Sequence, residues 1–337
     1  MIDNKCMILI TGGSGFIGTN LQEIFLEKGY SFVNFDKSKP ENKLHNAYWH
    51  EGNIMELSDL RVAFEKYHPQ IVVHLAARTD TASLNLEDYI ENTKGTQNVV
   101  DIIKEYPCVK RCIMTSTQYV YKSLTHPFPA SDTDYMPHTV YGESKKIAEL
   151  YVRNAGLQCC WTIVRPANVW GPWHMRYPVQ LWKIIDQGLY FHPTKRHVVR
   201  TYAYVKNLVF QIVQILNATE DEVNQRTFYL GDLPLDSIVW LSELTYQIKG
   251  GKLHYIPSCL MWCAAVVGEV LGKFGIQFPM YMTRYRNMLE DFYAPTNITV
   301  AKFGVRNSDL SENMAETVEW LHNEAQELFP YWARKKK

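Results

Sequence analysis

The 337-residue sequence lacks an excess of either charge, and it lacks a hydrophobic run long enough to cross a membrane. Lys and Arg together number 35, as do Asp and Glu. A broad basic surface of the kind that binds nucleic acid is therefore not expected. The most apolar late stretch, Cys259–Val267, ends at Gly268 and Glu269 and is too short to span a bilayer. We expect neither a nucleic-acid partner nor stable membrane insertion.

No secretion signal and no metal-binding cysteine pattern are expected either. Met1–Lys5 leads directly into an apolar strand, which a signal peptide would have to use as its own hydrophobic region. The seven cysteines are an odd number, and pairs such as Cys259 and Cys263 lack the partner pair that a zinc site needs. We therefore expect reduced cysteines, no metal and a cytoplasmic location.

What the sequence does contain is a regular alternation of short β-branched runs and helical patterns. This alternation predicts an α/β protein with a doubly wound parallel sheet of the Rossmann type. Strands are expected at Cys6–Thr11, Ser31–Phe35, Ala47–His50, Ile71–Leu75, Arg111–Thr115 and Trp161–Arg165. Helices are expected at Gly15–Lys28, Leu57–Tyr67, Tyr89–Tyr106 and Val140–Asn154.

The pattern changes after Gly171-Pro172, where Trp, Tyr, Pro and His become frequent. A helix at Val205–Leu216 and a strand at Arg226–Leu230 then resemble a return to the first domain. We expect a Rossmann domain over residues 1–172 with return segments at about 204–232. A smaller, mostly helical substrate domain is expected over 173–203 and 233–330.

A glycine-rich turn follows the first strand. Gly12, Gly15 and Gly18 lie between an apolar strand and a helix, a spacing typical of a loop that binds a pyrophosphate at the helix N-terminus. Asp36 follows at the end of the second strand, 18 positions after Gly18. A carboxylate there accepts hydrogen bonds from the adenosine ribose and repels a 2′-phosphate, so NAD is favoured over NADP.

Tyr141 and Lys145 open the helical pattern at Val140–Asn154 and share one face of that helix. A nearby ammonium stabilises a phenolate and so prepares the tyrosine to take a proton from an alcohol. The hydroxyls of residues 115–117 end the preceding strand, where ligands of doubly wound sheets lie. The pair therefore predicts hydride-transfer chemistry on a small-molecule alcohol.

These motifs resemble the extended short-chain dehydrogenase/reductase family, especially its nucleotide-sugar epimerases and dehydratases. Matching segments extend from Thr11 to about Trp320 and include Thr11–Gly18, His74–Ala77, Asn92–Thr96, Ser116–Tyr121, Tyr141–Lys145 and Arg165–Pro172. The resemblance implies that Thr117 holds the reacting oxygen beside Tyr141 and that Lys145 also binds the nicotinamide ribose. It implies further cofactor contacts at Phe16, Ile17, Asn53, Ile54, Leu75, Ala76, Ala77, Asn92, Thr115 and Pro166. Asn53 stands where the family usually has an adenine-binding Asp.

The same resemblance implies a substrate and an assembly. Asn168 and Arg200 are expected to contact the diphosphate of a nucleotide sugar, and Arg284 or Arg286 is expected to complete a clamp. The helices that contain Asn92–Lys104 and Tyr141–Arg153 are expected to form a homodimer.

The residues after Thr117 distinguish between reactions. Related dehydratases have an acidic residue two places on, whereas this chain has Gln118 and Tyr119. Neither replaces a carboxylate at neutral pH, so dehydration is disfavoured. Epimerisation through a transient ketone and simple ketone reduction remain, and Asp36 favours epimerisation because related ketoreductases more often use NADPH.

Two other interpretations stay open. Ile256–Phe278 is unusually apolar, and Tyr204–Asn207 also resembles the 3β-hydroxysteroid dehydrogenases, which would imply an apolar alcohol as substrate. The preferred interpretation of the apolar stretch is that Leu260, Trp262, Ala264 and Val267 form the buried side of a substrate-domain helix. A dinucleotide-sensing scaffold without activity is the remaining alternative, and the presence of Tyr141 and Lys145 disfavours it.

Overall fold

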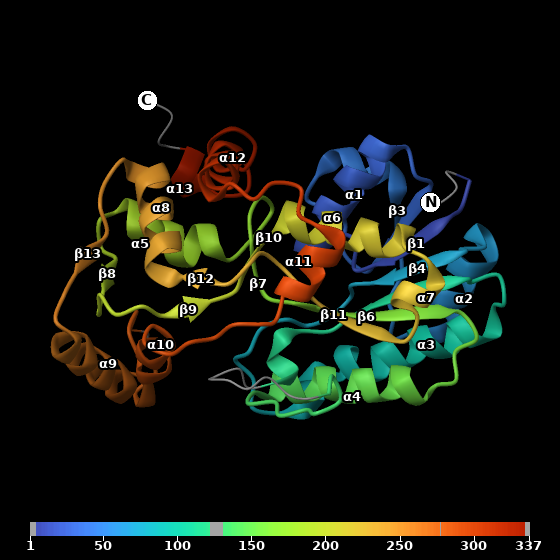
Figure 1. Cartoon of the computed structure of the whole chain (residues 1–337), viewed down its shortest axis with the longest axis horizontal. Coiled ribbons are helices and arrows are strands. Elements are labelled where there is room, and N and C mark those ends of the chain that lie inside the picture. Colours follow the sequence, from blue (N-terminus) through green and yellow to red (C-terminus); the bar gives the residue numbers. More distant parts are fainter. Residues whose placement is uncertain (1–4, 122–130, 277, 334–337) are drawn as a thin grey trace.

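A seven-stranded parallel sheet forms the centre of the larger lobe (Figure 1). The computed structural model describes residues 5–121, 131–276 and 278–333. The strand order is β11-β6-β5-β4-β1-β2-β3, and every pairing is parallel. The predicted doubly wound Rossmann fold is confirmed. Its strands are β1 (Ile8–Thr11), β2 (Phe32–Asp36), β3 (Trp49–Glu51), β4 (Ile71–His74), β5 (Arg111–Thr115), β6 (Cys160–Pro166) and β11 (Arg226–Leu230).

Helices cover both faces of this sheet (Figure 1). Ile8 and Ile10 pack on one face, while Leu9 between them packs on the other, as the alternation of side chains along a strand requires. The first face is covered by α1 (Phe16–Lys28) and α6 (Val205–Asn217), and the second by α2 (Leu57–Tyr67), α3 (Thr96–Glu105) and α4 (Val140–Asn154).

Two local differences from the sequence prediction lie beside the predicted cofactor site. Residues Lys43–Tyr48 form a 3-10 helix, so β3 begins only at Trp49 instead of Ala47. The helix expected from Tyr89 begins with a π-helical turn at Glu91–Gly95 before α3. Such widened turns are frequent at functional sites because they redirect a side chain.

The smaller lobe is built around aromatic side chains. The rings of Tyr202 and Trp240 stack with centroids 4.5 Å apart, and Trp170 packs edge-on against Trp240.

The proposed domain boundaries stay a prediction. The remaining elements are β7 (Asn168–Trp170), α5 (Lys183–Asp186), β8 (Phe191–His192), β9 (Val199–Arg200), β10 (Tyr202–Tyr204), α7 (Glu220–Val223), β12 (Leu235–Asp236), α8 (Ser237–Lys249), β13 (His254–Tyr255), α9 (Ser258–Lys273), α10 (Met282–Asn287), α11 (Asn297–Phe303), α12 (Leu310–Asn323) and α13 (Pro330–Ala333).

The prediction that the apolar side of the late helix is buried was wrong. In α9, Leu260, Trp262 and Val267 are 58%, 49% and 50% exposed, while Met261 and Ala265 are buried instead. The helix is apolar on nearly every side, so the sequence pattern did not distinguish the side that packs from the side that faces outward. No helix among the described residues is long and apolar enough to cross a membrane.

A buried ion pair connects α4 to the sheet. Glu149 on α4 and Arg165 on β6 are both almost inaccessible, and two hydrogen bonds of 2.9 and 2.7 Å join their side chains. Tyr135 donates a further hydrogen bond to Glu149, and the guanidinium of Arg165 also donates to the carbonyl of Asp132. The pair therefore determines how the helix that carries Tyr141 lies on the sheet.

We expect Glu149→Ala to lower the free energy of unfolding by about 3 kcal/mol or more, because it leaves the Arg165 charge buried without its partner. Chemical denaturation measures the effect. Glu143→Ala, on the same helix, is the matched control. Glu143 pairs with Lys146 at the surface with a side chain that is 41% exposed, so its loss should cost less than about 1 kcal/mol. Equal effects of the two variants would contradict this assignment.

Candidate active site

A cavity of about 830 Å³ opens beyond the carboxyl ends of the central strands. It extends from the glycine loop after β1 to residues of the smaller lobe. This is the position where doubly wound sheets bind ligands. Of the residues predicted to bind cofactor or substrate, the cavity is lined by Gly12, Gly15, Phe16, Ile17, Gly18, Asp36, Asn53, Ile54, Leu75, Ala76, Ala77, Thr115, Thr117, Tyr141, Lys145, Pro166 and Asn168.

The glycine loop is shaped for a close approach of backbone groups. Gly12 has a φ of +73°, and a Cβ there would lie 2.5 Å from the backbone nitrogen of Ala76. Only glycine fits this position without displacing the end of β4. The loop leads into α1, whose first backbone N–H groups have no partner within the helix and favour an anion. This arrangement fits a dinucleotide pyrophosphate.

Asp36 lines the same cavity beside the glycine loop. Its two carboxylate oxygens accept backbone N–H bonds from Ser14 (3.0 Å) and Ser38 (2.9 Å). These bonds fix the carboxylate in place, and each oxygen keeps a second lone pair for a ribose hydroxyl. Burial raises the pKa of Asp36, which the two N–H bonds oppose. Lys37 next to it pairs with Glu91 at 3.3 Å.

Tyr141 and Lys145 are positioned by the first turns of α4. Thr139 caps this helix by accepting the N–H of Gly142 at 3.0 Å. A Cβ at Gly142 would lie 2.3 Å from the carbonyl oxygen of Tyr119, so glycine is required for α4 to approach the segment after β5 so closely. That approach brings the phenol of Tyr141 within hydrogen-bonding reach of Thr117.

Burial dominates the electrostatics of the pair. It raises the pKa of Tyr141 to about 12, with the hydrogen bond from Thr117 acting in the opposite direction. It lowers the pKa of Lys145 to about 8, opposed by the negative charge of Glu149. Without a ligand, both residues therefore favour their neutral forms more than free side chains do. A positive charge brought into the cavity would move the Tyr141 pKa down again.

Gln118 and Tyr119 lie in different surroundings. Gln118 is buried and does not line the cavity, whereas Tyr119 does. The ring of Tyr119 packs against His138 and Tyr141. Among the described residues that line the cavity, the carboxylates are Asp36 and Glu91, and Glu91 pairs with Lys37 next to Asp36. Tyr119 lies two places after Thr117, where related dehydratases have an acidic residue, so this chain has a phenol at that position.

Asn92 is the predicted cofactor residue that does not line the cavity. It is fully buried in the π-helical turn, where its side chain accepts the N–H of Arg78 at 2.8 Å and donates to the carbonyl of Arg78 at 2.9 Å. It also donates to Ser144, whose hydroxyl bonds the carbonyl of Tyr141. Asn92 therefore joins the segment after β4 to the catalytic helix.

Arg200, Arg284 and Arg286, which were predicted to bind the substrate, are not among the residues that line the cavity. Arg200 donates to the carbonyl of Glu290, and its charge still acts on Tyr119. Arg284 lies over the ring of Tyr281, and Arg286 is exposed on α10. The described structure does not bring Arg284 and Arg286 to the cavity, because α10 holds them on another surface of the smaller lobe.

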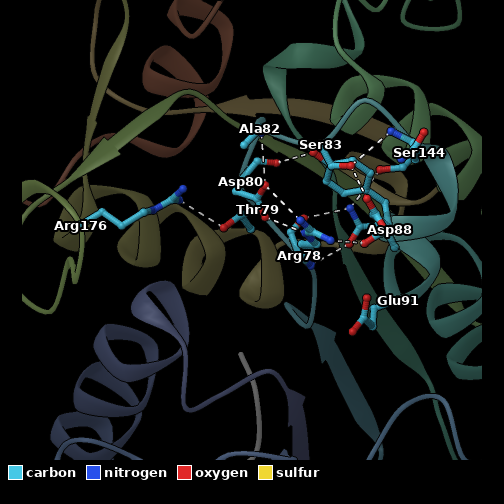
Figure 2. A network of polar contacts seen from close by, with 12 residues as sticks. Arg78, Thr79, Asp80, Ala82, Ser83, Asp88, Glu91, Ser144 and Arg176 are labelled. Carbon is cyan, nitrogen blue, oxygen red and sulfur yellow. Dashed lines mark hydrogen bonds and ion pairs between the residues drawn. The ribbon is translucent and has the colours of Figure 1, made fainter. Parts of the chain in front are cut away.

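Sequence reasoning missed Arg176. It lines the cavity, and its guanidinium donates to Thr79 at 3.3 Å from the smaller lobe, as Figure 2 shows. Its charge also acts on both Tyr119 and Tyr141. Arg176 lies in a stretch without helical or strand periodicity, so nothing in the sequence indicated which way its side chain would point.

We expect Lys145→Met to raise the stability of the cofactor-free protein. The pKa of Lys145 falls from 10.5 to about 8, which corresponds to about 3 kcal/mol of unfavourable folding energy while the lysine is charged. The gain should be full well below pH 8 and should fall by more than half between pH 7.5 and 9.5, because the buried lysine of the folded protein loses its proton there while the unfolded lysine keeps its own. Denaturation at several pH values measures it. Lys146→Met, the neighbouring control, should show no such pH dependence, and a pH-independent gain in Lys145→Met would refute the explanation.

Comparison with known proteins identifies the family. The profile of the NAD dependent epimerase/dehydratase family matches residues 8–231. UDP-glucuronate 4-epimerase of Thermodesulfobacterium geofontis is 29% identical over 49% of this chain and 56% of its own length, and human short-chain dehydrogenase/reductase family 42E member 1 is 25% identical over 94% and 87%.

Solved structures show the same fold at lower identity. ADP-L-glycero-D-manno-heptose-6-epimerase of Helicobacter pylori superposes with a TM-score of 0.71 at 20% identity, covering 96% of this chain and 99% of the other. UDP-glucose 4-epimerase of Thermotoga maritima, solved with UDP-glucose, gives 0.67 at 22%, covering 93% and 98%. The chain belongs to the NAD dependent epimerase/dehydratase family and is an NAD-dependent enzyme of the extended short-chain dehydrogenase/reductase type.

Proposed function

We propose that this protein is a nucleotide-sugar epimerase that acts through a transient keto-sugar. The observation that carries the proposal is the cluster of Thr117, Tyr141 and Lys145 on a cavity where the carboxylates, among the described lining residues, are Asp36 beside the glycine loop and Glu91 paired with Lys37. Such a site moves one proton and lacks the extra acid that elimination of water requires. Relatives named as UDP-glucuronate and UDP-glucose 4-epimerases support a UDP-sugar as the first substrate to test.

The proposed chemistry assigns one task to each residue. NAD, when bound, would supply the hydride acceptor and donor for this chemistry. Thr117 holds the sugar hydroxyl against Tyr141, whose phenolate removes the hydroxyl proton. Burial raises the Tyr141 pKa to about 12 without a ligand. The positive charge of a bound oxidised nicotinamide would lower that pKa, and the Lys145 ammonium would act in the same direction.

The second half of the reaction reverses the first on the other face of the sugar. The ketone turns over in the cavity, and Tyr141 returns its proton to the new hydroxyl. Asn168 and Arg200 remain our proposed contacts to the diphosphate. We add Arg176, because it lines the cavity and its charge lies near Tyr141. Binding through the diphosphate would leave the sugar free to rotate.

Net oxidation of an apolar alcohol is the second candidate. The exposed apolar residues of α9 favour it, as does the 25% identity to human short-chain dehydrogenase/reductase family 42E member 1 over most of both chains. Reduction of a nucleotide keto-sugar would use the same three residues. Both alternatives consume cofactor in each turnover, whereas epimerisation does not.

We also propose that the enzyme is a cytoplasmic homodimer paired through α3 and α4. Tyr151 on α4 donates to Asp101 on α3 at 2.6 Å, so the two helices form one surface. Ile90, just before the π-helical turn that leads into α3, is 48% exposed, and Leu150 on α4 is 37% exposed.

All seven cysteines are unpaired, which suits a reducing compartment.

A panel of UDP-, GDP-, dTDP- and CDP-sugars tests the activity. The expected result is interconversion of two epimers without added reductant. Mass spectrometry and NMR identify the products. Released cofactor from denatured protein should be NAD. Strict dependence on added NADH or NADPH would contradict epimerisation in favour of reduction, and turnover of an apolar alcohol alone would support the second candidate.

Tyr141→Phe should reduce turnover by at least about 10³-fold, because it removes the group that moves the proton. Cofactor binding should remain, since the ring and its packing are kept. Tyr119→Phe is the matched control on the same cavity wall and should lose far less activity. Activity retained by Tyr141→Phe would overturn the catalytic assignment.

A further inference from the structure

The turn that carries His174 fixes the side chain in one protonation form. Its Nδ1 accepts the backbone N–H groups of Arg176 at 3.3 Å and of Tyr177 at 3.0 Å. A ring nitrogen that accepts a hydrogen bond carries no proton, so the proton of the neutral ring lies on Nε2. Burial and the charge of Arg176 lower the pKa of His174 to about 3. The ring is therefore a neutral donor at physiological pH.

The His174 ring is held between two aromatic neighbours. It stacks on Tyr177 with ring centroids 4.0 Å apart, and it meets Phe16, the first residue of α1, edge-on at 4.7 Å. The residue is only 8% exposed. It nevertheless lines the cavity of about 830 Å³, where it is the only histidine among the described lining residues.

The second ring nitrogen of His174 has no protein partner in the described part of the chain. Both hydrogen bonds of the side chain go to Nδ1. Because Nδ1 faces the backbone of its own turn, Nε2 lies on the opposite side of the ring. A buried donor without a partner is unfavourable. Such a donor in the wall of a cavity indicates an acceptor that a ligand supplies.

The segment just before His174 is fastened to α1. Asn20 donates to the carbonyl of Pro172 at 3.0 Å, and the indole N–H of Trp173 donates to Glu23 at 2.9 Å. Trp173 has a φ of +68°, which a bulky side chain adopts only where its surroundings hold it. The ring of His174 is thereby fixed beside the N-terminus of α1, where unpaired backbone N–H groups favour an anion.

We propose that His174 binds a diphosphate in the cavity, with its Nε2–H donating to a phosphate oxygen. The helix N-terminus and the Arg176 guanidinium both favour negative charge beside this donor. Arg176 lines the same cavity and reaches Thr79 (Figure 2). The pyrophosphate of NAD and the diphosphate of a nucleotide sugar offer the same chemistry. The first source rests on the NAD dependence of the family, and the second rests on the function proposed above.

Two substitutions at His174 separate the tasks of its two nitrogens. His174→Asn keeps an acceptor near the position of Nδ1 and removes the distal donor. His174→Gln brings an amide N–H near the position of Nε2 and loses the acceptor for the turn. Both remove the ring, so the loss of its packing is common to the two. Calorimetry measures the dissociation constant of NADH, and then those of UDP, GDP, dTDP and CDP on enzyme saturated with NAD.

We expect His174→Asn to weaken binding of at least one of these ligands by about tenfold or more, because a hydrogen bond to a charged phosphate is lost. His174→Gln should stay within about threefold of the wild type. A loss confined to NADH assigns the bond to the cofactor, and a loss confined to a nucleoside diphosphate assigns it to the substrate.

Binding of every ligand by His174→Asn at wild-type strength overturns the proposal. So does a loss in His174→Gln that equals or exceeds the loss in His174→Asn, since the residue would then only support the turn. A wild type that binds NADH and none of the four nucleoside diphosphates contradicts the proposed nucleotide-sugar substrate. The NADH measurement still decides the role of His174 in that case.

Nitrogen NMR of the wild-type protein, labelled with ¹⁵N-histidine, tests the same bond without a variant. One neutral ring should carry its proton on Nε2 before ligand is added. Its Nε2 resonance should shift when NADH or a nucleoside diphosphate saturates the protein. If no histidine Nε2 resonance shifts with any of these ligands, the proposal is overturned.

Discussion

The burial of Lys145 beside Tyr141 is the constraint on which the rest of the site depends. An ammonium loses favourable hydration when it is buried, and its pKa of about 8 reflects that loss. The fold holds it there because Glu149, one helical turn further along α4, is itself fixed to the sheet by Arg165. The same helix thus carries the reactive pair at one end and a buried ionic anchor behind it.

The cavity lies between two lobes. The sheet and its glycine loop form one side of it, and both Asp36 and Tyr141 line it. The smaller lobe supplies Arg176 and the aromatic wall around Tyr119. Arg176 reaches Thr79 on the larger lobe, so the lobes are in contact across the cavity. Part of the cavity wall therefore comes from the lobe whose sequence has the least regular pattern.

Helix α9 shows how composition alone can mislead. Helix burial is inferred from one apolar stripe against a polar side. In α9 almost all positions are apolar, and the side chains that pack are the small or flexible Met261, Ala265 and Gly268. The larger Trp262 and Phe274 face outward. On the packed side, a Cβ at Gly268 would lie 1.7 Å from the carbonyl oxygen of Met280, a close approach that the local sequence pattern does not indicate.

The amino-acid sequence alone predicted the parallel sheet and the glycine loop with Asp36 after it. Strand alternation, the glycine spacing and the position of Asp36 are local signals, because each is visible within a short segment. The strand order β11-β6-β5-β4-β1-β2-β3 was not predicted, because it depends on pairings between distant segments. The pairing of Tyr141 with Lys145 was also visible, since both lie on one helix.

What lies around that pair depends on the tertiary structure. Asn92 was expected at the cofactor, and it lies in the π-helical turn, where its side chain bonds the backbone of Arg78. Arg284 and Arg286 lie on α10 away from the cavity, while Arg176 enters it. These positions depend on how irregular segments of the smaller lobe pack over long sequence distances, and side-chain direction there has no period from which it could be predicted.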